Sequence, residues 1–453
     1  MTLKAVVIGC THAGIAAVKQ ILKNYPNAEI TVYERQSTIS YLSCATYLHI
    51  EGTVKSLDDA RYVEPDDFAD EGVTMQINHD VIRINASEHT LLVQNMATKA
   101  MATDTYDKLI MATGSLTAIP AIPGVENPKV LLCKTYNQAH SLCDYSTNQK
   151  RVAIIGGGYV GIELAEGYAN TGHEVLLIQQ PTHLLDQYVE PEISQVVARL
   201  LKAHGVHVLR HTRVTAFEDT DEGKLSLATE AGKFEVDMAA ISAGIIPQTD
   251  LLHGQVKMAP NGAILTDDYM HTSNPDILAA GDASVSHDNQ TKAPGYAPLV
   301  SHAIRQGTLA GINTFERRLR TIGTQNTTGV LIFDHTLARA GLTMTQTKAA
   351  HLNAAHVLYA GPYRPKFMPE HYPVMVDLVY DKNTRKILGI QLLCQHDISQ
   401  AANVVSALMQ NGGTIDQMAM LDMLFSPNFS EPFNYLNKAA QMAVDQENGY
   451  MRT

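Results

Sequence analysis

Several kinds of residue and pattern are scarce in this chain of 453 residues. It has no tryptophan, and its five cysteines are an odd number that includes no Cys-x-x-Cys pair. This usage argues against a secreted disulfide framework and favours a reducing compartment. The formal net charge is −12 without any Lys/Arg run, which argues against nucleic acid or an anionic membrane as partner. No uninterrupted apolar run approaches the ~20 residues of a membrane span, so we expect a cytoplasmic protein.

Metal-binding patterns and repeats are also missing. The 19 histidines are scattered without the His-Glu-x-x-His or similar spacing of a zinc site, so we predict no metal. No low-complexity segment or short-period repeat occurs. With 45% hydrophobic and 18% charged residues, the composition is that of an ordinary globular protein, and the length allows two or three domains.

Two glycine-rich turns, about 150 residues apart, each close an apolar strand and open an amphipathic helix. The first turn contains Gly9, Thr11, His12, Ala13 and Gly14. The second contains Ile155, Gly156, Gly158, Tyr159, Val160 and Gly161. Backbone N–H groups at such a helix N-terminus bind a pyrophosphate. One turn of this kind is weak evidence, but two predict two dinucleotides and electron transfer between them.

The order of these patterns predicts an α/β protein with two Rossmann-like dinucleotide-binding domains and a C-terminal α+β domain. We expect the first domain to be discontinuous and to comprise residues 1–114 and 246–325. The second domain occupies residues 115–245, bounded by segments that contain Pro and Gly. Residues 326–453 have no glycine turn of their own and carry predicted strands followed by helices.

Other polar or small residues stand at the ends of predicted strands. Glu34, followed by Arg35, lies about 20 residues after the first turn, where an acidic side chain binds a ribose 2′-hydroxyl. Two further strands end at Ala112, Thr113 and Gly114 and at Gly244. An apolar strand delivers Asp282 to its carboxyl end, and we expect a helix to follow it to about residue 315.

Cys44 stands alone, since no second cysteine lies within a few residues of it. A lone thiolate beside a redox cofactor can cycle through sulfenic acid or a mixed disulfide. A helical stretch begins directly after Cys44, and a helix N-terminus would lower the pKa of its thiol. The other four cysteines are interpreted as ordinary structural residues. They are Cys10, Cys133, Cys143 and Cys394.

Taken together, these motifs resemble the flavoprotein disulfide reductase superfamily, whose members bind two dinucleotides, over essentially the whole chain. The resemblance also includes Ser43-Cys44 and the runs 156–163, 280–282 and 424–429. Because a second redox cysteine is missing, the chain is similar to the single-cysteine branch of NADH oxidases, NADH peroxidases and coenzyme A-disulfide reductases. The most similar group is the water-forming NADH oxidases of lactic-acid-bacterial type.

This resemblance implies FAD in the first domain and NADH in the second. The FAD contacts it implies come from the first turn, Glu34, Arg35, Cys44, the run 112–114 and Asp282, which would hold the ribityl chain. In the second domain, Tyr159 matches the residue that covers the flavin ring, and Glu163 matches an acidic residue near that ring. The second turn, Gln179 and Gly244 complete the implied NADH contacts.

The choice between NADH and NADPH depends on the end of the strand 174–178. NADH-dependent relatives usually carry a carboxylate there, but this chain has Gln179-Gln180. No arginine follows closely, and His183 is the only candidate cation nearby in the sequence. We therefore expect NADH to be preferred and NADPH to be used measurably, with the Gln179 amide bonding a ribose hydroxyl.

The function implied by the resemblance is reduction of O₂ to water by NADH through FAD and Cys44, which would alternate between thiolate and sulfenic acid. His12 would act as acid and base beside the cysteine, as a neutral imidazole because a helix N-terminus disfavours the cation. The C-terminal domain would build a homodimer.

Three alternatives stay open at this level. An NADH peroxidase would share Cys44 and His12 and take peroxide in place of O₂. A coenzyme A-disulfide reductase would bind coenzyme A through residues such as Arg61, Tyr62 and Tyr435. From a different class, the chain could be a redox sensor or an electron-transfer reductase for a protein partner.

Overall fold

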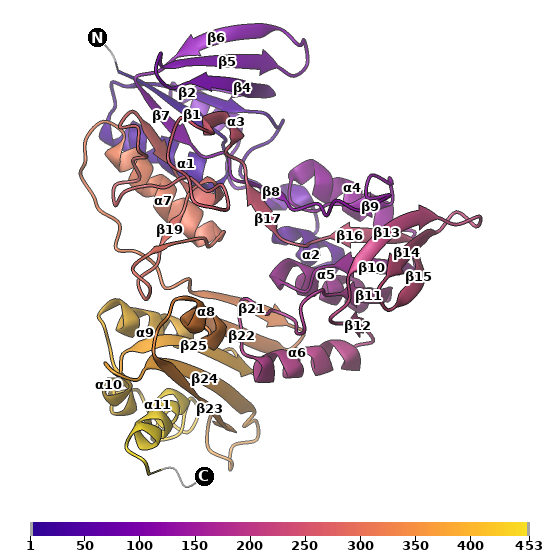
Figure 1. Cartoon of the computed structure of the whole chain (residues 1–453), viewed down its shortest axis with the longest axis vertical. Helices are drawn as coiled ribbons and strands as arrows, with labels where there is room; N and C mark the ends of the chain where they lie inside the picture. The colour runs from indigo at the N-terminus through magenta and orange to yellow at the C-terminus, as the bar shows by residue number, and fades with distance from the viewer. Residues whose placement is uncertain (1–2, 451–453) are drawn as a thin grey trace.

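The computed structural model describes residues 3–450 and shows three sheet-based units (Figure 1). The first unit is built on a parallel five-stranded sheet in the order β18-β7-β1-β2-β3. Its strands are β1 (Lys4–Ile8), β2 (Glu29–Glu34), β3 (Thr74–Ile77), β7 (Lys108–Met111) and β18 (Ile277–Ala279). This sheet contains β1, near the start of the chain, and also β18, which comes after the whole second unit in the sequence. Such an arrangement is expected for a discontinuous unit.

Helices α1 (His12–Asn24) and α7 (Val300–Asn313) pack against each other beside this sheet (Figure 1). They approach closely because Gly307 and Gly311 face the backbone of α1, where a Cβ atom would overlap carbonyl oxygens. An antiparallel sheet of β4 (His79–Asn85), β5 (Thr90–Asn95) and β6 (Met101–Thr105) completes the top of the unit. Three short helices, α2 (Ala45–Ile50), η1 (Leu57–Ala60) and α3 (Pro65–Ala69), link β2 to β3.

The second unit repeats this design with a parallel sheet in the order β12-β11-β10-β16-β9. Its strands are β9 (Val130–Leu131), β10 (Arg151–Ile155), β11 (Glu174–Ile178), β12 (His207–Leu209) and β16 (Met238–Ile241). Its helices are α4 (Tyr136–Ser146), α5 (Tyr159–Asn170) and α6 (Pro191–Ala203). An antiparallel sheet of β13 (Val214–Asp219), β14 (Leu225–Thr229) and β15 (Gly232–Val236) packs against it.

The chain passes between these two units along a two-stranded antiparallel ribbon. The ribbon pairs β8 (Ser115–Thr117) with β17 (Ile245–Pro247). It lies where the sequence analysis divides the chain into domains, although that division stays a prediction.

The third unit is an antiparallel sheet in the order β21-β22-β25-β24-β23 covered by helices (Figure 1). The strands are β21 (Thr328–Ile332), β22 (His335–Gly341), β23 (Ala354–Pro362), β24 (Pro373–Asp381) and β25 (Ile387–Cys394). The helices are α8 (Met344–Ala349), α9 (Ser399–Gln410), α10 (Ile415–Ala419) and α11 (Tyr435–Glu447). The predicted fold class, α/β with a C-terminal α+β unit, is confirmed.

A helix follows Asp282 as expected and ends at Asn313, but it does not begin directly after the aspartate. A short 3₁₀ turn η3 (Gly281–Ala283) and a hairpin of β19 (Ser286–His287) and β20 (Pro294–Gly295) come first. The helix α7 begins only at Val300, because Pro294 and Pro298 cannot donate the hydrogen bonds of a helix interior. Asp282 itself follows the carboxyl end of β18, as predicted.

The two glycine turns have the same construction. Gly9 and Gly156 both have positive φ, and a Cβ on either would overlap the carbonyl oxygen at the end of the adjacent strand, from Ala112 or Ser242. Gly14 and Gly161, one turn into the helices, face the carbonyl oxygens of Gly9 and Gly156. Each helix is therefore docked tightly onto its turn, with its first N–H groups directed at the sheet edge.

This packing predicts losses of stability of different size for two alanine substitutions in the second turn. In an ordinary helix, Gly161→Ala would stabilise by up to about 1 kcal/mol. Here the added methyl overlaps the Gly156 carbonyl, and we expect a net loss of about 2 kcal/mol or more. Gly158→Ala, which meets open space, is the matched control and should cost less than about 1 kcal/mol. Urea unfolding of the two variants checks this, and equal stabilities would contradict it.

Candidate functional site

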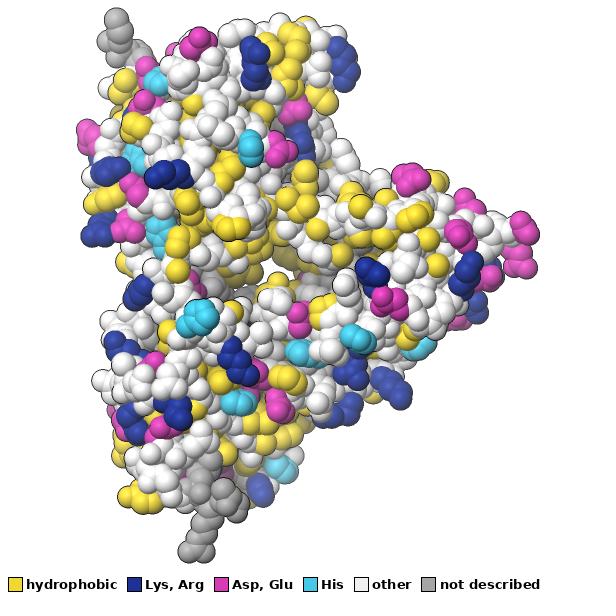
Figure 2. Space-filling view, viewed as in Figure 1, with side chains coloured by type: hydrophobic (Ala, Val, Ile, Leu, Met, Phe, Trp, Pro, Cys, Tyr) yellow, Lys and Arg dark blue, Asp and Glu magenta, His cyan; other side chains and the backbone are white. Residues whose placement is uncertain are grey.

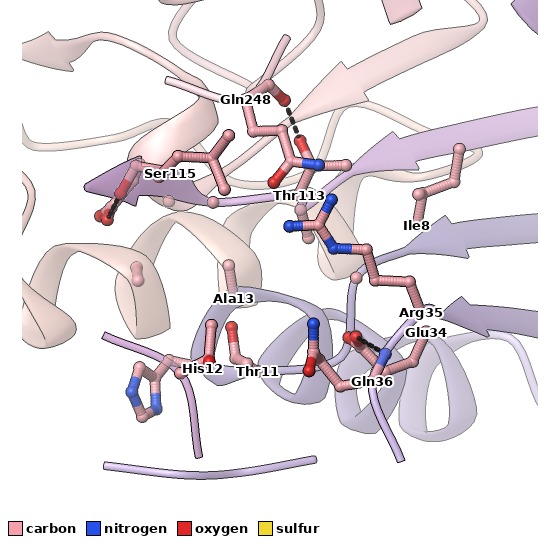
Figure 3. Close-up of a pocket in the computed structure, with 18 of the residues that line it drawn as sticks. Ile8, Thr11, His12, Ala13, Glu34, Arg35, Gln36, Thr113, Ser115 and Gln248 are labelled. Carbon is pink, nitrogen blue, oxygen red and sulfur yellow. Dashed lines mark hydrogen bonds between the residues drawn. The ribbon is translucent and has the colours of Figure 1, made fainter. Parts of the chain in front are cut away.

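A cavity opens at the carboxyl edge of the first sheet, above the first glycine turn (Figure 3). Predicted cofactor residues that line it are Gly9, Thr11, His12, Ala13, Glu34, Arg35, Ala112, Thr113, Gly114 and Asp282. This is the position at which open α/β sheets bind ligands, since the strand ends and helix N-termini meet there. The Thr113 hydroxyl donates to the Gln248 carbonyl oxygen at 2.6 Å. Figure 3 marks this bond with a dashed line.

Glu34 is buried at the floor of this cavity. One carboxylate oxygen accepts the N–H of Cys10 at 2.8 Å. The other accepts the N–H of Gln36 at the same distance (Figure 3). Burial raises the pKa of Glu34, while these bonds favour its charged form. Each carboxylate oxygen has a second lone pair, so the side chain can still accept a bond from a ligand hydroxyl.

Asp282 lies where the cavity leads toward the second unit. Ser115 Oγ donates to its carboxylate at 2.6 Å, and Lys134 Nζ lies 3.4 Å away. Sequence reasoning missed both partners, because Lys134 and Ser115 belong to segments far from Asp282 in the chain. Lys134 comes directly before the capping box of α4, which fixes its backbone.

His12 is the first residue of α1 and is held by Tyr62. Its Nδ1 lies 2.9 Å from the Tyr62 hydroxyl, and the two rings are nearly parallel at 6° with centroids 5.9 Å apart. Burial is the main cause that lowers the pKa of His12, with Lys134 adding to it and Asp282 opposing it. The expected neutral imidazole agrees with this direction.

A larger cleft of about 800 Å³ lies between the units, in front of the second glycine turn. The predicted residues that line it are Cys44, Ile155, Gly156, Gly158, Tyr159, Val160, Glu163, Gln179 and Gly244. Its size is that of a cofactor or small-molecule site. The surface is hollowed where the units meet, and hydrophobic side chains gather around this hollow (Figure 2). The cleft shares Ser43, Lys134, Asp282, Pro298 and Val300 with the first cavity.

The predicted residues thus fall into two groups that meet at one place. Of these residues, all of which the structure describes, Gly14 and Gly161 line neither cavity. They pack behind the turns instead, where they allow the helices to dock. A direct cofactor contact for these two glycines stays a prediction.

Cys44 is exposed in the cleft at the N-cap of α2. The pKa of its thiol is raised, mainly because the surrounding walls partly desolvate it and also because the Glu163 carboxylate repels a thiolate. The expectation that the helix start lowers this pKa is therefore wrong. The physical reason is that α2 has only six residues, so its dipole is outweighed by desolvation and a neighbouring carboxylate.

Of the other cysteines, Cys133 also lines the cleft, whereas Cys10, Cys143 and Cys394 do not. Cys10, Cys133 and Cys394 are buried and Cys143 is half-buried, and burial raises the pKa of all four thiols. Cys44 is the exposed cysteine of the chain.

Glu163, which lines the cleft with Cys44, forms an acidic pair on α5 with Glu166. Burial raises the pKa of Glu163 to about 7, and the nearby Glu166 contributes to that shift. Burial likewise raises the pKa of Glu166 to about 7. The charge next to Cys44 therefore changes near neutral pH.

Tyr159 stands at the start of α5 and packs against Tyr188, with ring centroids 4.2 Å apart and the rings tilted by 38°. The guanidinium of the buried Arg339, from β22, lies 5.9 Å from the centre of the Tyr188 ring. The third unit thereby supports the aromatic pair from behind. Sequence reasoning assigned no role to Tyr188 or Arg339, because only the tertiary fold brings them to Tyr159.

Gln179 follows β11 in the same position that Glu34 has at the end of β2. Its Oε1 accepts the N–H of Gly157 at 2.6 Å, as Glu34 accepts that of Cys10. Among the described residues, the cation that lines the cleft on this side is Arg213 and not His183, which corrects the expectation about His183. Arg213 pairs with Glu230 at 3.4 Å.

The residues suggested to bind coenzyme A make other contacts within the protein. Arg61 bonds Asp58 at 3.0 Å and Glu64 at 2.9 Å, so its charge is neutralised locally. Tyr62 holds His12, and Tyr435 begins α11 in the third unit. This arrangement does not favour an anionic thiol at that position.

Within residues 3–450, the structure brings together no group of three or more His, Cys, Asp or Glu side chains that could hold a metal ion. None of the helices in the same range is long and apolar enough to cross a membrane.

Comparison with known proteins gives two family matches. A family model described as pyridine nucleotide-disulphide oxidoreductase matches residues 3–307. The model of the dimerisation domain of the same family matches residues 327–436.

Individual relatives match over the whole length. An NADH oxidase of Enterococcus faecalis is 41% identical, over 98% of this chain and 100% of its own. One from Streptococcus pneumoniae is 33% identical, over 97% of this chain and 99% of its own. The structure of a water-forming NADH oxidase from Lactobacillus brevis, bound to NADH, superposes with a TM-score of 0.97 at 43% identity, covering 99% of each chain. The chain belongs to the pyridine nucleotide-disulphide oxidoreductase family.

Proposed function

We propose that this protein is an FAD-dependent NADH oxidase that reduces O₂ to water and uses Cys44 as a redox-active thiol. The observation that carries the proposal is the meeting of two dinucleotide-type cavities at Ser43, Lys134 and Asp282, with His12 on one side and Cys44 on the other. The water-forming NADH oxidase of Lactobacillus brevis, bound to NADH, has nearly the same fold, which supports this assignment.

The residues around the first cavity fit FAD. The glycine turn presents helix N–H groups at the sheet edge for a pyrophosphate, and Glu34 retains acceptor capacity for a ribose hydroxyl. Asp282 is placed to accept from the ribityl chain at the junction of the cavities. When bound, the flavin supplies hydride acceptance from NADH and electron transfer to O₂.

The second cleft fits the nicotinamide dinucleotide for the same reason. Gly158 is the N-cap of α5, and the space around its Cα is open, so a pyrophosphate can approach the backbone. Tyr159 lines the cleft, where it would cover the ring of the flavin until the nicotinamide enters. Glu163 lies close to the same position.

Cys44 would remove peroxide in a two-electron step. The thiolate attacks one peroxide oxygen, the O–O bond breaks, hydroxide leaves, and the cysteine becomes a sulfenic acid. The hydroxide takes up a proton to form water. Two electrons and one proton from a second NADH, with one proton from solvent, then restore the thiol and release a second water.

His12 would accept and then donate the proton in this step. Because the pKa of the Cys44 thiol is raised, it needs a base, and the neutral imidazole of His12 can accept a proton. The resulting imidazolium can then protonate the leaving hydroxide. The Tyr62 hydroxyl, bonded to Nδ1, would fix the ring so that Nε2 exchanges the proton.

We also propose that the chain is a homodimer and acts in the cytoplasm. The dimerisation-domain match supports the first point, as do the exposed hydrophobic residues Leu424, Phe425, Phe429 and Phe433. Reduced cysteines without a disulfide support the second.

The alternative activities are tested by the experiments below. They are reduction of coenzyme A disulfide, reduction of peroxide and electron transfer to a protein partner.

The first prediction concerns the product of O₂ reduction. The parent should consume two NADH per O₂ and release little peroxide, whereas Cys44→Ser should consume one NADH per O₂ and release hydrogen peroxide, because only the peroxide reductant is lost. Parallel oxygen-electrode, NADH and peroxide measurements check this. Cys143→Ser, outside the cleft, is the matched control and should behave like the parent.

The contrary outcomes are distinct. Water formation by Cys44→Ser at the parental ratio would mean that the cysteine is not the peroxide reductant. A parent that consumes added peroxide quickly and O₂ poorly would be a peroxidase. Reduction of coenzyme A disulfide with release of free thiol would indicate the third activity, and inertness toward all three acceptors would point to a protein partner.

The second prediction concerns pH. At pH 7.5 most Glu163 is ionised, since its pKa is about 7, and it disfavours the Cys44 thiolate. Glu163→Gln removes this repulsion, so the pKa of Cys44 should fall and its alkylation by iodoacetamide at pH 7.5 should accelerate severalfold. At pH 6, where parental Glu163 is mostly protonated, the two rates should converge.

The control for this experiment is Glu71→Gln, an exposed glutamate of the first unit. It should leave the alkylation rate of Cys44 unchanged at both pH values. Peptide mapping confirms that Cys44 carries the label. A Glu163→Gln protein that reacts no faster than the parent at pH 7.5 would contradict the role of this carboxylate.

The third prediction concerns assembly. Light scattering should give about twice the 49.4 kDa of one chain. Phe425→Asp combined with Phe429→Asp should shift the protein toward monomer, because two charges would enter a buried apolar interface. Phe367→Asp, at a more exposed phenylalanine in a different loop, is the control and should remain dimeric. An active parental monomer would refute the proposal.

A further inference from the structure

The side chain of Gln179 is fully used within the protein. It is buried, with 6% of its surface exposed. Its Oε1 accepts from Gly157, and its Nε2 lies 3.2 Å from Asp186 Oδ1 and 3.4 Å from the carbonyl oxygen of His183. The amide has two N–H groups, and both are directed at these acceptors. Gln179 therefore has no N–H left for a ribose hydroxyl, in contrast to the expectation from the sequence.

Asp186 is the acidic group that this arrangement places at the same corner of the cleft. It lines the cleft together with Gln179 and Gln180, and it is half-buried. Gln179 donates to Oδ1, and Gln187 Nε2 donates to Oδ2 at 2.7 Å. A carboxylate has about four acceptor sites, so two remain for a ligand. The carboxylate missing from the strand end is thus supplied from seven residues later in the chain.

The loop that carries Asp186 is anchored on the glycine turn itself. Leu185 has a positive φ of 54°, and its N–H donates to the Gly157 carbonyl at 2.9 Å. Leu184 and Leu185 are completely buried, and Leu184 packs against Gly157. The loop cannot move away from the turn without breaking these contacts, so Asp186 holds a fixed place beside the dinucleotide cleft.

We propose that Asp186, held by Gln179, is the residue that selects NADH over NADPH in this protein. Its carboxylate would accept from a ribose hydroxyl and repel a 2′-phosphate, which carries further negative charge at short range. Arg213, the cation lining the cleft on this side, pairs with Glu230 at 3.4 Å, which partly neutralises its charge. The inference rests on the proposed NADH site and names its specificity residue.

The test measures binding without turnover. ADP-ribose and 2′-phospho-ADP-ribose are titrated into the flavin-loaded parent and into Asp186→Asn by calorimetry, and kcat/KM for NADH and NADPH is measured alongside. The parent should bind ADP-ribose more tightly. In Asp186→Asn the preference should shift toward the phosphorylated ligand by about tenfold or more, with weaker ADP-ribose binding and tighter 2′-phospho-ADP-ribose binding.

A matched control separates local from general charge effects. Asp221→Asn removes one carboxylate from the exposed hairpin between β13 and β14 of the same unit, and it should leave both affinities unchanged. Retained flavin and an unchanged unfolding midpoint show that Asp186→Asn is folded. If that variant has lost its fold, Asp186→Glu, which keeps the charge, must preserve the parental preference for ADP-ribose.

The possible outcomes test the role of Asp186 separately from the proposed NADH site. A parental preference for ADP-ribose that survives Asp186→Asn overturns the role of Asp186 and leaves the NADH site intact. A shift of equal size in Asp221→Asn also overturns it. A parent that binds neither ligand overturns the NADH site itself, and this inference with it.

Discussion

The tight docking of a helix onto a glycine turn is the constraint on which both cofactor cavities depend. In each parallel sheet, the absence of a Cβ at Gly9 or Gly156 lets the turn touch the neighbouring strand end, and its absence at Gly14 or Gly161 lets the helix touch the turn. The first N–H groups of α1 and α5 then face the carboxyl edge of the sheet, where an anion is bound most favourably. Loops that follow the other strands complete each cavity.

The junction between the cavities follows from how the chain crosses between the units. The ribbon of β8 and β17 fixes the second sheet relative to the first, and Lys134 and Asp282 meet across that junction. Cys44 and His12 border it from opposite sides. A thiol with a raised pKa and an imidazole with a lowered pKa keep the proton on Cys44 at rest, so transfer to His12 costs free energy and would form the thiolate only transiently. The acidic pair on α5 adds a charge that responds to pH near neutrality.

In the second unit, the carboxylate at the cofactor cleft comes from a loop residue and not from the end of the strand. At the end of β2, Glu34 accepts from the glycine turn and presents its carboxyl group to the cavity. At the end of β11, Gln179 makes the same backbone bond without a charge, and the loop at Asp186 returns a carboxylate to the site. The backbone bond and the charge are thus separate requirements, and the second unit meets them with two residues.

The sequence by itself determined the strand–turn–helix pattern, the α/β class, the lone Cys44 and most residues that line the cavities, because these depend on local periodicity and on glycine at fixed spacings. It could not determine which residues distant in the sequence come into contact. The partnership of Tyr62 with His12, of Lys134 with Asp282 and of Arg339 with Tyr188 arises from segments that meet only in the folded protein. The raised pKa of Cys44 was mispredicted for the same reason: the local helix start was visible in the sequence, whereas the cleft walls and Glu163 come from the packing of α5 against α2.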